Sequence, residues 1–184
     1  MKRAIALSLT TLLLLGGVLL FSCTGGISPA ANPLAHQQYP LVVVADLTYG
    51  NTEYTITLTL TAPMTATIEF LEPATLVGYV FTITPEGVTL SFGEVTVQYN
   101  NNSMPGGSLL LPQMFSLDMS QLLRQEESVV NSVPLNVAVF ATPHGEITLF
   151  INQNTSLPLR VEAVHEGTPV VLRIRTITSG DVAE

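Results

Sequence analysis

Apolar and polar residues alternate most regularly between Thr52 and Phe70. The run breaks once, at Ala62–Pro63, and both halves keep a period of two. The apolar positions are Tyr54, Ile56, Leu58 and Leu60 before the break and Met64, Ala66, Ile68 and Phe70 after it. Such a period places apolar side chains on one face of a strand and polar side chains on the other. The pattern therefore predicts an antiparallel β-hairpin with one buried and one solvated face.

Shorter apolar segments on both sides of this hairpin predict further strands. Turn residues separate them at regular intervals, which is typical of a β-meander. The predicted strands are Leu41–Tyr49, Tyr79–Thr84, Val88–Phe92, Val95–Tyr99, Leu135–Thr142, Glu146–Asn152, Leu159–Val164 and Pro169–Ile177. Charged residues of the last two strands are expected on the solvent side, where cross-strand ion pairs contribute well under ~1 kcal/mol each. These residues are Arg160, Glu162, Arg173 and Arg175.

A helical period follows the polar stretch Asn100–Gly107, which we expect to be a loop. The apolar residues at helical spacing are Leu111, Phe115, Met119 and Leu122, with Met114 and Leu123 beside them. Pro112 is acceptable in a first turn, so the helix should begin near Leu110 or Leu111. We expect one helix over 111–123 that folds across the apolar face of the sheet. The stretch Gln125–Ser132 either continues this helix weakly or forms a loop.

The N-terminus has the layout of a secretory signal. Lys2 and Arg3 precede an uncharged run from Ala4 to Phe21. The next residues, Leu20-Phe21-Ser22-Cys23, resemble a bacterial lipobox, whose cysteine is diacylated after cleavage of the signal before it. Two acyl chains would anchor the protein stably at a membrane surface. An ordinary secretory signal with an incidental cysteine is the alternative.

The predicted domain organisation follows from this leader. Residues 1–22 are a lipoprotein signal peptide, and residues 23–39 are the acylated Cys23 with a flexible tether rich in Gly, Ser, Pro, Ala and Asn. We expect His36 to be a solvated residue of that tether. Residues 40–178 form a single domain, and residues 179–184 form a disordered tail.

The charge of the chain excludes some partners. The 184 residues include 47% hydrophobic and 11% charged residues, with a formal net charge of −8. Removal of residues 1–22 leaves four arginines, no lysine and 14 acids, a formal charge of −10. Such a chain offers no basic patch to nucleic acid or to anionic head groups. Cys23 is the only cysteine, so no intramolecular disulfide can form.

No motif in the sequence points to catalysis. G-x-S-x-G, H-E-x-x-H and P-loop patterns are absent, and no pair of histidines has the spacing of metal ligands. His144 and His165 fall in predicted turns, where we expect them to be solvated. Asp46 and Asp118 have no obvious carboxylate partner, although spatial pairing with a distant glutamate stays open. The prediction is a protein that is not an enzyme and has no cofactor or metal.

Two stretches carry a resemblance to a known family. They are Pro73-x-x-Leu76-x-Gly78-x-x-Phe81 and Leu157-Pro158-Leu159-Arg160-Val161-Glu162 leading into Val170–Ile177. Over about Leu41–Thr178 the chain resembles the LolA/LolB superfamily of lipoprotein carriers, in particular divergent lipid-anchored members of Gram-positive bacteria. The chain departs from the soluble carriers in its own lipobox, few basic residues and short helical segment.

The resemblance implies a mainly β fold with a short α insertion (α+β). A curved antiparallel half-barrel sheet would be covered on its concave face by a helical plug, and the apolar cavity between them would hold acyl chains. The residues expected to line that cavity are Ile56, Leu58, Leu60, Ile68, Phe70, Met114, Phe115, Met119 and Leu122.

Two functions remain open at this point. In the first, a lipoprotein held on the outer face of the cell membrane, or at the outer membrane of a Gram-negative host, binds a lipid or the acyl chain of another lipoprotein. Its partners are then the membrane, through the diacylglycerol on Cys23, and the acyl ligand. In the second, the core is filled, and a non-catalytic accessory lipoprotein of envelope or spore assembly binds a protein partner.

Overall fold

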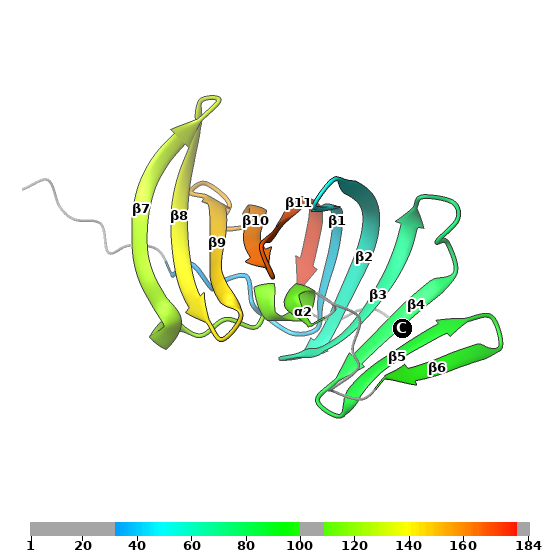
Figure 1. Ribbon diagram of the computed structural model, residues 1–184. Helices are drawn as coiled ribbons and strands as arrows, with labels where there is room; N and C mark the ends of the chain where they lie inside the picture. Colours follow the sequence, from blue (N-terminus) through cyan, green and yellow to red (C-terminus); the bar gives the residue numbers. More distant parts are fainter. Residues whose placement is uncertain (1–31, 100–108, 180–184) are drawn as a thin grey trace, which may run out of the picture. The chain divides into compact units, whose positions relative to one another are not determined.

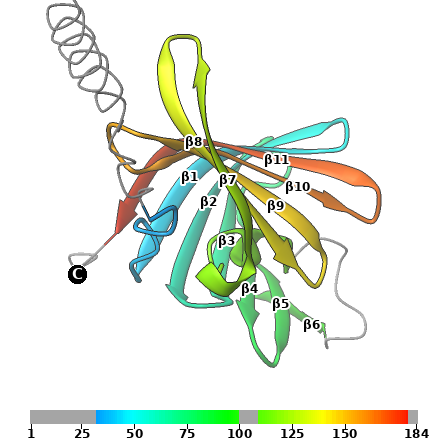
Figure 2. The same cartoon turned by 90° about the vertical axis from the view of Figure 1, so that its left-hand side faces the viewer.

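Eleven strands form one antiparallel sheet that curves strongly and stays open (Figures 1 and 2). The computed structural model describes residues 32–99 and 109–179. Within them the strand order is β6-β5-β4-β3-β2-β1-β11-β10-β9-β8-β7, so β1 and β11 pair at the centre while β6 and β7 lie at the two edges. The strands are β1 (Leu41–Tyr49), β2 (Thr52–Ala62), β3 (Thr65–Glu72), β4 (Tyr79–Thr84), β5 (Gly87–Phe92), β6 (Val95–Tyr99), β7 (Leu122–Val130), β8 (Val133–Thr142), β9 (Gly145–Asn152), β10 (Pro158–His165) and β11 (Thr168–Ser179).

The predicted alternation decides which side chains form the core. In β2, Ile56, Leu58 and Leu60 are buried, and Leu58 lies opposite the buried Val43 of β1 and Ile68 of β3. Directly opposite residues share a face, so this row marks the buried, concave face of the sheet. The prediction of a mainly β fold built from hairpins is confirmed.

The turn between β2 and β3 differs slightly from its prediction. The alternation predicts Met64 as an apolar position of the second strand, but Met64 lies in the turn with a φ of 57°. Its backbone N–H donates to Ser116 Oγ at 3.0 Å, which ties the turn to the segment that follows α2 (Leu110–Met114).

The prediction of one helix over 111–123 is wrong beyond its first turn. α2 has only five residues, a 3₁₀ turn η1 occupies Met119–Gln121, and Leu122 and Leu123 begin β7. Asp118 starts η1, because its carboxylate accepts the N–H of Ser120 at 2.7 Å while its own N–H donates to the Gln121 side chain. Local bonds of this kind compete with a continuous helix. Strand β7 then replaces both alternatives considered for 125–132.

The short helical segment nevertheless packs on the concave face. Leu110, Leu111, Met114, Phe115 and Leu117 belong to the same buried cluster as the inward side chains of the sheet. Figure 1 shows α2 within the curve of the sheet. Met119 is not part of this cluster, because its side chain is 46% exposed.

Residues 32–40 are not the end of a solvated tether. Tyr39 donates its hydroxyl hydrogen to the Phe115 carbonyl at 2.7 Å, and the His36 ring lies edge-on to the Phe115 ring with centroids 6.3 Å apart. His36 is only 4% exposed, so the expectation of a solvated histidine is wrong. Neither His36 ring nitrogen makes a hydrogen bond of standard geometry.

Several predicted segments lie outside the described residues. They are the signal peptide, Cys23, the tether up to Ala31, the loop at Asn100–Gly107 and the last five residues. Within the described residues, no helix has the length and apolar character needed to span a membrane.

The buried His36 predicts a pH dependence of stability. Desolvation lowers its pKa from 6.5 to about 4, an effect that the Pro33 carbonyl partly offsets. Protonation therefore favours the unfolded chain, so stability is fully present above pH 6.5 and declines as the pH falls toward 4. Over that window the loss amounts to about 3 kcal/mol from this residue.

Chemical denaturation from pH 7 to pH 4 measures this loss. Between pH 7 and pH 4, the free energy of unfolding of His36→Leu should fall by about 3 kcal/mol less than that of the wild-type chain. The control variant His144→Gln alters an exposed turn residue and should follow the wild type. If the free energy of unfolding changed with pH in the same way for His36→Leu and the wild type, His36 would not stay neutral in the fold.

Two methionines of the same segment provide a test of its packing. Met114 is fully buried, so Met114→Ala should lower the free energy of unfolding by about 2–5 kcal/mol. The exposed Met119 should tolerate the same change within about 0.5 kcal/mol. Urea denaturation compares the two variants, and equal losses would mean that 119 also faces the core.

Candidate functional site

Six of the nine residues expected to line a cavity lie together in the closed core. Ile56, Leu58, Leu60, Met114 and Phe115 have no exposed surface, and Ile68 is almost fully buried. A side chain beside a void large enough for water would retain accessible surface. The space between α2 and the sheet is therefore filled at these residues.

The other three predicted residues lie at different places. Phe70 and Leu122 are partly buried and pack against the core from β3 and β7. Met119 is exposed in η1 and does not join them. The structure thus brings Phe70 to the border of the core, and it separates Met119 and Leu122 from the helix on which they were predicted.

An open apolar surface continues from the core across β3, β4, β5 and β6. Phe81 lies opposite the buried Ile68, Leu90 lies opposite Phe81, and Val97 lies opposite Leu90, so all four share the concave face. Burial decreases along this row, because Phe81 and Leu90 are partly buried and Val97 is 44% exposed. We call this surface the β3–β6 apolar face; its members are Phe70, Phe81, Leu90, Phe92, Val95 and Val97.

Aromatic contacts hold this face in shape. The rings of Tyr54, Phe70 and Phe81 follow one another edge to face, with centroids 5.6 and 5.9 Å apart. Tyr79 stacks on Phe92 at 4.5 Å. Phe92 remains 50% exposed, and its neighbour in register, Val95, is 65% exposed.

Gly78 allows Phe92 to lie against the turn before β4. Its φ is 91°, and a Cβ at this position would lie 3.3 Å from the Phe92 ring. A glycine is therefore favoured both by the backbone conformation and by the close approach of the ring.

Sequence reasoning identified Phe70 and missed the rest of the face. Strands β4, β5 and β6 were predicted, and the alternation within them places Phe81, Leu90 and Val97 on one side. A single sequence does not indicate which part of a sheet face another segment will cover. In the part of the chain that the structure describes, it is tertiary packing that buries Ile68 and leaves Val97 exposed.

A second candidate site lies on the opposite, outer face of the sheet. Arg173 of β11, Asp46 of β1, Thr55 of β2 and Glu72 of β3 occupy directly opposite positions in four adjacent strands. They line a groove of about 680 Å³ together with Thr48, Glu53, Tyr54, Pro73, Ala74 and Arg175. We call this the outer groove.

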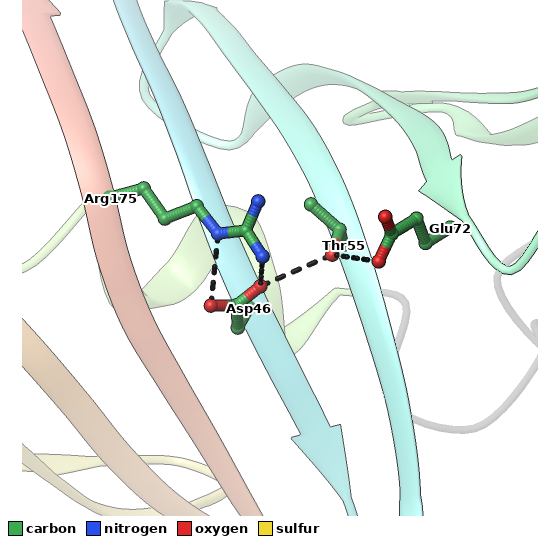
Figure 3. A network of polar contacts seen from close by, with 4 residues as sticks. All are labelled: Asp46, Thr55, Glu72 and Arg175. Carbon is green, nitrogen blue, oxygen red and sulfur yellow. Dashed lines mark hydrogen bonds and ion pairs between the residues drawn. The ribbon is translucent and has the colours of Figure 1, made fainter.

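Four of these side chains form a continuous network (Figure 3). Arg175 donates from Nε to Asp46 Oδ2 at 3.0 Å and contacts Oδ1 through Nη2 at 2.6 Å. The almost fully buried Thr55 hydroxyl lies 3.1 Å from Asp46 Oδ1 and 3.1 Å from Glu72 Oε2. A hydroxyl has one hydrogen, so it donates to one of the two carboxylates at a time.

This network connects Asp46 to a distant glutamate, the possibility that the sequence left open. Glu72, 26 positions later in the sequence, shares Thr55 with it. The hydrogen bond from Arg175 is the main cause that lowers the pKa of Asp46, and the Thr55 hydroxyl and the charge of Arg173 add to it. Asp46 is thereby held as a carboxylate at neutral pH.

The other charged residues partly match their predictions. Arg175 and Asp46 form a cross-strand pair between β11 and β1, whereas Arg160 pairs with Glu162 along its own strand β10. His144 is exposed as expected, and His165 lies 3.2 Å from the Tyr49 hydroxyl. In the ranges 32–99 and 109–179, no group of His, Cys, Asp or Glu is arranged to hold a metal ion.

Comparison with known proteins places the fold. No family model and no curated protein matches the sequence. Among solved structures, an uncharacterized conserved protein from Thermus thermophilus aligns with a TM-score of 0.50 at 17% identity, covering 83% of this chain and 86% of that one. A LolA superfamily protein from Nitrosomonas europaea aligns with a TM-score of 0.44 at 12% identity, covering 82% and 92%.

The Mycobacterium tuberculosis lipoprotein LppX is also similar, with a TM-score of 0.42 at 13% identity over 79% of this chain and 90% of that one. At these identities the likeness is one of fold alone. The description of the Nitrosomonas europaea structure agrees with the superfamily that the sequence resembles.

Replacement of Arg175 tests the electrostatics of the outer groove. In Arg175→Gln, the pKa of Asp46 should rise toward its ordinary value, because the main cause of its lowering is removed. An NMR titration of the side-chain carboxyl carbon measures this pKa. The variant Arg124→Gln, on edge strand β7, serves as the matched control. An Asp46 pKa equal in both variants would contradict the assigned contact.

Proposed function

We propose that this protein is an envelope lipoprotein that binds an acyl chain on the β3–β6 apolar face while the diacylglycerol on Cys23 holds it to the membrane. The acyl chain belongs to a lipid or to another lipoprotein. The observation that carries this proposal is the continuous row from buried Ile68 through Phe81 and Leu90 to exposed Val97.

An apolar ligand suits this surface energetically. Contiguous exposed apolar surface is uncommon on soluble proteins and marks interaction sites. Burial of an acyl chain of ~16 carbons contributes on the order of 10 kcal/mol before the costs of binding, at ~0.8 kcal/mol per methylene. The formal charge of −10 that remains after removal of residues 1–22 also disfavours anionic head groups and leaves the hydrocarbon tail as the recognised part.

The proposed site differs from the cavity predicted between sheet and helix. That space is filled by Met114 and Phe115, so the ligand would lie beside the covering segment. Phe70 connects the two regions, because it contacts both the core and the Phe81 ring. The role is binding, with no catalytic step assigned to any residue.

The filled core also favours the second candidate function. Ile56, Leu58 and Leu60 leave no room around them, as expected of an accessory lipoprotein that binds a protein instead of a lipid. In this version, the same β3–β6 apolar face receives apolar side chains of an envelope protein. The two functions therefore differ in the occupant of one face.

Photocrosslinking in the membrane-anchored full chain distinguishes these occupants. Benzoyl-phenylalanine replaces Val97 on the concave face or, as the control, Gln98 on the outer face of the same strand. Both positions are exposed and adjacent in sequence, so they differ mainly in the face that they report. Mass spectrometry of the crosslinked peptides identifies the adduct.

We expect lipid adducts at 97 that exceed those at 98 several-fold. A protein adduct confined to 97 would support the second function instead. Equal lipid labelling at both positions would reflect general contact with the membrane and would refute an acyl site on this face.

A further inference from the structure

The outer groove lies on the opposite side of the sheet from the proposed acyl site. Asp46 and Thr55 alternate along their strands with the buried Ala45 and Ile56, so their side chains point away from the core. The acyl site does not use this groove, and a role for it is independent of the proposed function.

Its lining carries charges that the protein itself leaves unpaired. Asp46 satisfies Arg175 through two short contacts. Among the described residues, Arg173, Glu53 and Glu72 form no ion pair. Arg173 acts on Asp46 and Glu72 acts on Arg175 only through the longer-range attraction of their charges. The groove therefore presents a guanidinium on β11 and two carboxylates on β2 and β3 that are not engaged in an ion pair.

The separation of the strands that carry these charges restricts the length of the ligand. Arg173 and Glu72 stand in one row, and their backbones are three strand spacings apart, which corresponds to roughly 14 Å. An extended chain of four residues spans about 13 Å. A zwitterionic lipid head group, whose opposite charges are only a few bonds apart, is much shorter than this backbone separation.

We propose that the outer groove binds a short extended peptide with free termini, with its carboxylate at Arg173 and its ammonium at Glu72 and Glu53. A guanidinium binds a carboxylate in a bidentate manner, which fixes the direction of the peptide. The groove volume of about 680 Å³ falls within the size range of small-ligand sites.

Thr55 connects Glu72, where the ammonium group would bind, to Asp46. Its single hydroxyl hydrogen serves either Asp46 or Glu72. An ammonium group at Glu72 donates to that carboxylate in its place, so the hydroxyl hydrogen becomes available to Asp46. In the bound state Glu72 is paired with the ammonium group, while Asp46 keeps its contacts with Arg175 and gains the hydroxyl hydrogen of Thr55.

NMR titration of the full chain with an alanine series tests the proposal. The probes are di-alanine, tetra-alanine, N-acetylated and C-amidated tetra-alanine, and phosphoethanolamine. Tetra-alanine should shift the amide signals of residues 46, 55, 72 and 173 in a saturable way. Di-alanine, the capped peptide and phosphoethanolamine should each bind about tenfold more weakly, because each loses one charged contact or both.

Matched variants locate the two ends. Arg173→Gln and Glu72→Gln should each weaken tetra-alanine binding about tenfold. Arg124→Gln and Glu126→Gln are the controls. They make the same changes of charge on the edge strand β7, away from the groove, and should leave binding unchanged. All four positions are exposed, and unchanged circular dichroism verifies that each variant folds.

Four results would overturn the proposal, and the first three concern the peptide and the variants. These are no saturable binding of tetra-alanine, equal affinity of the free and capped peptides, or equal losses in the groove variants and the β7 variants. Phosphoethanolamine binding as tight as that of tetra-alanine would assign the groove to a head group and also refute the peptide. None of these outcomes changes the crosslinking expected at position 97. The peptide proposal and the acyl-chain proposal can therefore be refuted independently of each other.

Discussion

The burial of Met114 and Phe115 on the concave face is the contact on which the rest of the structure depends. A strongly curved open sheet has an apolar inner face that must be covered. α2, with five residues, is too short to be stable alone, so packing and not helical propensity holds it there. The segment 33–39 also holds this covering segment, because the Tyr39 hydroxyl donates a hydrogen bond to the Phe115 carbonyl.

The limited reach of that covering segment explains where the apolar surface stays open. α2 contacts the sheet near β2, whereas β4, β5 and β6 extend beyond it (Figure 1). Their inward side chains keep the same pattern as the core, but no helix among residues 32–99 and 109–179 packs on them, and exposure rises from Ile68 to Val97. One alternation thus produces both the stable core and the surface to which we assign binding.

The two faces of the sheet carry opposite chemistry because the side-chain period is two. Next to the buried Ile56 stands Thr55, which joins a network of acids and arginines on the outer face (Figure 3). The two edges differ as well. β7 carries Arg124, Glu126 and Glu127, which discourage pairing with another strand, whereas β6 has no charged residue.

The sequence alone determined most of the strands and the buried set of β2 and β3, because period-two alternation and turn residues are local signals. It did not distinguish a helix from a strand at Leu122–Val130, since pairing with β8 outweighs a short helical spacing. It also gave no sign that His36 would be buried by Phe115. The outer groove joins Asp46 to Arg175, 129 positions away, through the pairing of β1 with β11. Only the tertiary structure decided these contacts, because strand order and register bring together residues that no local pattern relates.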